Sequence, residues 1–259
     1  MARWLAAAFA LAIFVAASPA AAQDANGFGQ KGGLILSVDR LMPFLSFSSV
    51  TSTEVRGGNT VKTSDAGASM VLLLGREPTL GAVHTIPRLA LDYAVIDHLT
   101  IGGSFALGLG LSASRKVSTT PNAGGNTTVQ DSDQPRTTIV GFAPRVGYVI
   151  PIGRVFGFWP RLGFALYSVS TSEDIVNNVG DVVRNDSTSD VSFSLDLDPQ
   201  LLWVPTRHFF VHFGPVLNLP LTGSRSRTET TGNTASEFNA DLSVFHFGIS
   251  AGLGTWFDL

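Results

Sequence analysis

The chain has 259 residues, of which 14% are charged and 44% hydrophobic, and its formal net charge is −3. This composition excludes a disordered chain, which needs low hydrophobicity and high net charge, and a nucleic-acid-binding protein, because no cluster of Lys and Arg is present. The absence of cysteine excludes disulfides, thiolate metal sites, cysteine nucleophiles and a lipid anchor.

The first 22 residues have the features of an export signal. Arg3 supplies a positive charge ahead of an unbroken apolar run over 4–17, and Pro19 ends that run. Three alanines at 20–22 then offer small side chains at the cleavage position. The run is shorter than the roughly 20 residues that a membrane-spanning helix needs. We therefore predict a signal peptide over 1–22, cleaved before Gln23, and a single domain over 23–259.

The rest of the chain contains eight segments in which apolar residues alternate with small or polar ones. This period of two is typical of strands with two different faces. The clearest segment covers 99–112, where Leu, Ile and Phe, with one Gly, form one face and only Gly, Ala, Ser and Thr form the other. In chain order the eight segments begin near residues 34, 88, 99, 140, 156, 191, 209 and 245.

The connections between these segments alternate strictly between short and long. Tight turns are expected at Asp97-His98, Gly153-Arg154 and Thr206-Arg207. The long connections are rich in Ser, Thr, Asn, Gly and Asp and lie near 49–80, 113–136, 171–189 and 223–237. This rhythm predicts an all-β fold, an eight-stranded antiparallel up-and-down transmembrane β-barrel with tight turns at one rim and four long extracellular loops at the other. Both termini then lie at the tight-turn rim.

Side-chain size predicts which face points outward. A face in water would carry Lys and Glu, whereas the small residues found here fit the crowded interior of an eight-stranded barrel. The apolar face carries no charged residue across the middle of strands two to eight, and one Arg or Lys at the bilayer midplane would cost roughly 2–4 kcal/mol. We expect this face to contact lipid. The alternative is a soluble, periplasmic lipocalin-like carrier with its apolar face inside.

Taken together, the pattern resembles the small eight-stranded outer-membrane β-barrels of Gram-negative bacteria, the OmpA transmembrane-domain and OmpX-like class. The resemblance implies location in the cell outer membrane and a C-terminal signal read by the barrel-assembly machinery during biogenesis. In this chain Phe257 and Leu259 hold the positions of that signal, with Leu in place of the usual terminal aromatic residue.

Charged residues on the small face are predicted to lie inside the barrel. Three arginines and four aspartates nearly balance there, as buried charges require. We predict a salt-bridge network that fills the barrel; the alternative is a narrow gated pore or a proton path. The residues are Asp39, Arg88, Asp92, Arg145, Arg161, Asp196 and Asp198.

Proline precedes each of these arginines, at Pro87, Pro144 and Pro160, and Pro199 and Pro215 are weaker copies of the motif. Because proline lacks the N–H that a strand ladder needs, we predict β-bulges at these positions.

No catalytic motif is found: the chain contains no His-x-Ser pair, P-loop, GxSxG or HExxH sequence. We expect His84, His212 and His246 to point into the barrel, and His212 and His246 to be hydrogen-bonded there. The sequence therefore predicts a monomeric integral outer-membrane protein without cofactor or metal, surrounded by outer-membrane lipid. Its expected role is non-enzymatic, as an envelope structural or surface-interaction protein whose extracellular partner the sequence does not identify. The alternative function is a narrow passive channel for small solutes.

Overall fold

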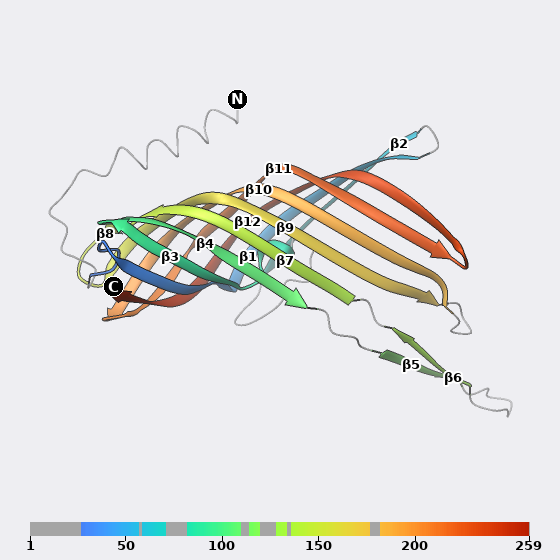
Figure 1. The fold of residues 1–259 in the computed structure, drawn as a ribbon, viewed down its shortest axis with the longest axis horizontal. Coiled ribbons are helices and arrows are strands. Elements are labelled where there is room, and N and C mark those ends of the chain that lie inside the picture. Colours follow the sequence, from blue (N-terminus) through green and yellow to red (C-terminus); the bar gives the residue numbers. More distant parts are fainter. Residues whose placement is uncertain are drawn as a thin grey trace.

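Eight long strands pair into one closed antiparallel ring in the computed structural model of the chain (Figure 1). The structure describes residues 27–56, 59–70, 82–109, 114–119, 128–133, 136–176 and 182–258, so the predicted signal peptide over 1–22 and Leu259 lie outside the described residues. The elements are β1 (Gly33–Arg56), β2 (Asn59–Met70), η1 (Ala82–His84), β3 (Arg88–Ile96), β4 (Leu99–Leu109), β5 (Ser114–Thr119), β6 (Thr128–Asp133), β7 (Arg136–Tyr148), β8 (Ile150–Pro151), β9 (Phe156–Val176), β10 (Val182–Thr206), β11 (Phe209–Thr231) and β12 (Thr234–Asp258).

The ring runs β1, β3, β4, β7, β9, β10, β11 and β12, and the pairing of β12 with β1 closes it. Each segment with period-two alternation corresponds to one of these strands, so the predicted fold class is confirmed. β2 pairs with the outer half of β1, β5 and β6 form a separate hairpin, and β8 adds a short pairing to β9. Among the described residues, no helix is long and apolar enough to cross a membrane.

The apolar face of the wall points outward. Along β7, Val140, Phe142 and Val146 are exposed, whereas Ala143 and Arg145 are buried in the interior. Large aromatic side chains are also exposed beside the tight turns, as in an interfacial girdle. These are Tyr93, Tyr148, Phe156, Trp203 and Phe209. The lipocalin-like alternative is therefore wrong, because it requires the apolar face inside.

Within the predicted long loops, the residues that the structure describes lie largely in strands. The connection near 171–189 consists mostly of the outer ends of β9 and β10, and that near 223–237 is a hairpin of β11 and β12 turning at Gly232, whose φ is +58°. The connection near 49–80 contains β2, and that near 113–136 contains β5 and β6. The sequence pattern did not identify these strand extensions, because the ribbons are polar on both faces. They show no alternation, although Ser- and Thr-rich segments pair well as strands when a neighbouring strand is present.

The predicted bulges are wrong at the four motif prolines that lie within strands. No register shift occurs at the in-strand prolines 144, 160, 199 and 215. Because proline lacks a backbone N–H, the strand pairing is only interrupted locally. No residue pair joins β10 to β11 between Leu197 and Leu201, and the register is the same on both sides of this gap. Shifts occur beside two other prolines, Pro43 in β1 and Pro220 in β11.

Candidate functional site

A bulge in β1 places two adjacent charged residues inside the barrel. The register between β1 and β12 shifts between Val38 and Met42, and Arg40 adopts a positive φ of 55°, which is uncommon for a residue with a side chain. Regular alternation would point the Arg40 side chain toward lipid, because the side chain of its neighbour Asp39 points into the barrel. The bulge turns the guanidinium inward, so that both side chains are buried.

Arg40 binds groups from across the barrel. Its Nη2 lies 3.1 Å from Asp196 Oδ1 and 3.2 Å from Asp198 Oδ1. Its Nη1 donates to Asn218 Oδ1 at 3.1 Å and to the carbonyl of His84. Arg88 Nη1 donates to the second oxygen of Asp196 at 2.9 Å. The two arginines therefore share one carboxylate between β1, β3 and β10.

Arg145 and Arg161 form the other half of the charge network. Arg145 donates from Nε to Asp92 Oδ1 at 2.9 Å, from Nη2 to the other oxygen of Asp92, and from Nη1 to Asp39. Arg161 donates to Asp39 Oδ1 at 3.1 Å and lies 3.6 Å from Asp198 Oδ2. Asp39 thus links Arg145 to Arg161, and Asp198, which contacts both Arg40 and Arg161, joins the two halves into one network.

All seven charged residues predicted for the interior are buried in this network. Strict alternation did not predict that Arg40 is buried. One signal was present in the sequence: Arg40 is a charged residue on the otherwise apolar, lipid-facing side of the first strand. A bulge that turns this side chain inward removes the conflict. With Arg40 included, the buried acidic and basic side chains of the described residues balance, at four aspartates and four arginines. Such balance is required because a buried charge without a partner is strongly destabilising.

The interior histidines extend the polar network. His212 lies between Gln200, whose Oε1 is 3.1 Å from Nδ1, and Asp39, whose Oδ1 is 3.1 Å from Nε2. His246 contacts the Ser48 hydroxyl at 3.1 Å, and its ring stacks on that of His84 with centroids 5.4 Å apart. These positions fit structural side chains within the packed interior.

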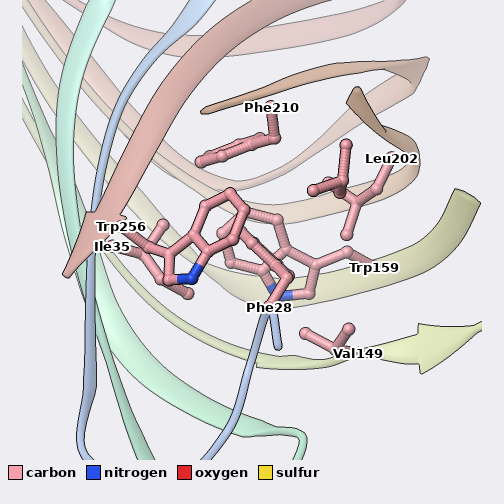
Figure 2. Packing of buried hydrophobic residues seen from close by; sticks show 8 residues of the cluster. Phe28, Ile35, Val149, Trp159, Leu202, Phe210 and Trp256 are labelled. Carbon is pink, nitrogen blue, oxygen red and sulfur yellow. The ribbon is translucent and has the colours of Figure 1, made fainter. Parts of the chain in front are cut away.

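An aromatic cluster seals the tight-turn end of the barrel (Figure 2). Phe28 comes from the Gly-rich turn before β1 and makes edge-to-face contacts with Trp159, Phe210 and Trp256, at centroid distances of 4.8–5.4 Å. Gly29 permits this insertion, because its φ is +80° and a side chain there would collide with Val149. The seal was not foreseen from the sequence, since Phe28 lies outside the alternating segments.

Buried side chains occupy the barrel interior at the level of the charge network and of the aromatic seal. A gap bordered by Arg88, Ser104 and Arg161 within the charge network has a volume of about 10 Å³, which is room for about one water molecule. The aromatic seal and the charge network therefore leave no solute-sized path through this part of the barrel.

Beyond an apolar layer of Val50, Leu242 and Val244, the wall continues as a polar chamber, here called the outer cup. Its volume is about 490 Å³. It is lined by the inward positions of the long hairpins: Ser52, Glu54, Thr63, Thr171, Glu173, Asp186, Thr188, Asp190, Arg225, Arg227, Phe238 and Ala240.

Ion pairs stiffen one wall of the outer cup. Arg225 donates to both oxygens of Asp190 at 2.7 Å, and this hydrogen bonding raises the pKa of the guanidinium. Arg227 lies 2.7 Å from Asp186 and 3.0 Å from Glu229. Among the described residues, no group of three or more His, Cys, Asp or Glu side chains is arranged to hold a metal ion.

The outer membrane protein OprG from Pseudomonas aeruginosa has a similar structure, with a TM-score of 0.51 at 12% identity over 91% of this chain and 100% of that chain. The fold is that of an outer-membrane β-barrel. The outer membrane protease OmpT from Escherichia coli aligns with a TM-score of 0.41 at 11% identity, covering 87% of this chain and 96% of that one. No protein-family model and no curated protein matches the sequence.

At the end of the last strand, Phe257 of the predicted assembly signal lies on the outer face of the barrel and pairs with Leu34 of β1.

Proposed function

We propose that the chain is an integral outer-membrane protein whose barrel is closed to solutes and whose long hairpins present a polar sheet at the cell surface. The filled interior is the observation that carries this proposal. A conducting barrel needs a continuous aqueous lumen, which eight strands do not leave when side chains occupy the interior. Here Trp159 and Phe210 close one end of the barrel. The ion pairs that Arg145 and Arg40 form with aspartates cross the centre of its interior.

The exposed apolar belt supports the membrane location. Leu107, Leu162 and Phe164 are about half exposed on the outer face, and an apolar surface around the whole circumference is favourable against lipid and unfavourable in water. The outer ends of β9 to β12 extend past this belt on the side away from the C-terminus (Figure 1).

The proposed role is non-enzymatic and depends on surface contacts. Loops and hairpins held by a rigid scaffold are where binding residues concentrate, and the outer ribbons expose Ser, Thr and charged side chains. As in the OmpA and OmpX-like class, we expect tight turns in the periplasm and hairpins outside the cell. The buried core of the barrel then serves to hold these hairpins in one arrangement.

The purified protein is expected to give no conductance steps in planar lipid bilayers, because the charge network and the aromatic seal block the interior. Flotation of parallel vesicles verifies that the protein has inserted. Unitary steps from the wild type that change in the Arg145→Ala variant would instead establish the passive channel and end the proposal of a closed barrel.

A further inference from the structure

We propose that a short turn inside the barrel is an acid-sensitive switch, which is held in place at neutral pH and is released when His84 takes up a proton. The turn covers residues 82–86, contains η1 and leads into β3, and it is here called the inner turn. The proposal goes beyond the surface role described above and does not depend on it. Its basis is the position of His84 beside two arginines and a second histidine.

The inner turn crosses the interior of the barrel. Val83 packs against buried side chains of β4, β7 and β9, including Ala106 and Tyr167. Arg40 of β1, which lies across the ring from β9, donates to the carbonyl of His84. The inner turn therefore belongs to the packed interior, although it is part of none of the eight strands.

The ring of His84 is buried without a hydrogen bond. Neither Nδ1 nor Nε2 has a hydrogen-bond partner among the described residues. Aromatic contacts hold the ring instead: it stacks on His246 with centroids 5.4 Å apart and lies edge-to-face with Tyr167 at 5.2 Å. A buried polar group without a partner is costly, so the choice of histidine at this position needs an explanation other than packing.

The surroundings of the ring accept a neutral imidazole and oppose a charged one. A proton on His84 would add a positive charge beside Arg40 and Arg88. The carboxylate of Asp196 also faces the ring, but these two arginines already share it. The titratable and charged groups around His84 are Arg40 of β1, Arg88 of β3, Tyr167 of β9, Asp196 of β10 and His246 of β12.

The stacked histidines lie close to the outer cup. Along the inward face of β12, His246 is followed by Val244 and Leu242 of the apolar layer and then by Ala240 of the cup lining. One apolar layer thus separates the pair from the cup, so release of the inner turn does not require the wall to unfold.

The direction of the pH dependence follows from these contacts. An imidazole in water takes up a proton below a pH of about 6.5, whereas the two arginines oppose the proton while the ring is held in place. Acid therefore favours the released turn, by up to about tenfold per pH unit below that value. Between about pH 7.5 and about pH 5, the ratio of released to held turn is expected to rise about 30-fold.

The test uses the full chain in detergent micelles and measures hydrogen exchange of the backbone amides of the inner turn by mass spectrometry. Exchange times are scaled for the intrinsic effect of pH on amide exchange. The wild type is expected to protect the inner turn at about pH 7.5 and to exchange it about 30-fold faster at about pH 5, while β9 stays protected at both.

His84→Phe is expected to abolish this response. Phenylalanine keeps the ring contacts with His246 and Tyr167, takes up no proton and gives up no hydrogen bond. The inner turn of this variant should stay protected at both pH values. His84→Gln, whose side chain is also uncharged at both, tests the same point if the phenylalanine variant does not fold.

His98→Asn is the matched control, because His98 lies at the tight turn between β3 and β4 and its φ of 71° is one that asparagine tolerates. It should keep the full response. Equal protection of the wild type at both pH values, no protection at about pH 7.5, an undiminished response in the His84 variants, or loss of the response in His98→Asn would overturn the proposal. None of these outcomes depends on conductance, so failure of the closed-barrel function is recognised separately.

Discussion

Replacing Arg145 with alanine is expected to lower the free energy of unfolding of the barrel by about 3–5 kcal/mol, the range for breaking a buried ion pair. Arg145 binds both Asp92 and Asp39, and all three side chains are buried. Its removal leaves two aspartates in the interior with fewer partners, and only Asp39 retains another arginine, Arg161. Urea unfolding in micelles, followed by tryptophan fluorescence, measures the change.

Arg207→Ala is the control for Arg145→Ala. Arg207 is also paired with an aspartate, Asp258 at 3.4 Å, but its side chain is 75% exposed at a tight turn. An exposed pair contributes about 0–1 kcal/mol, so this variant should unfold almost like the wild type. Comparable losses from both variants would show that the interior charges do not hold the barrel together.

Replacing Trp159 with alanine is expected to cost about 3–5 kcal/mol, as for other fully buried large aromatic residues. Its ring contacts Phe28 at 5.4 Å and the Arg161 guanidinium at 4.8 Å, and its Nε1 donates to Thr100 at 3.1 Å. The substitution leaves a cavity in the aromatic seal and removes one support of the charge network. The same urea titration detects the loss.

Trp203→Ala provides the comparison for the seal. Trp203 lies on the outer face and is 46% exposed, so its removal creates no enclosed cavity. It should lose less than half as much stability as Trp159→Ala. If the two variants lose the same amount, tryptophan contributes through contact with the detergent or lipid and the seal has no special role.

The strands and most interior charges could be predicted because a barrel wall obeys one simple rule. Successive side chains point to opposite faces, so the alternation that identified the strand at 140–150 also placed Arg145 inside. The rule fails where the backbone departs from regular pairing. Arg40 was missed because a bulge reverses the alternation within β1, and Phe28 because a glycine turn, not a strand, carries it into the barrel.

The outer cup could not be predicted for a different reason. Its lining depends on which residues lie opposite one another across strands, such as Glu173 and Asp186. That register is set by the whole closed ring and is not visible in a ribbon that is polar on both faces. The same uniform polarity made the outer ends of β9 to β12 look like loops.

The central claim, a closed barrel in the outer membrane, is tested most directly by gel mobility of the cell fractions, with samples left cold or boiled in SDS. We predict that the protein is found in the outer-membrane fraction and changes mobility on boiling, because its closed hydrogen-bonded wall resists SDS in the cold. A protein that is found in the soluble periplasmic fraction and migrates identically with and without boiling would contradict the account.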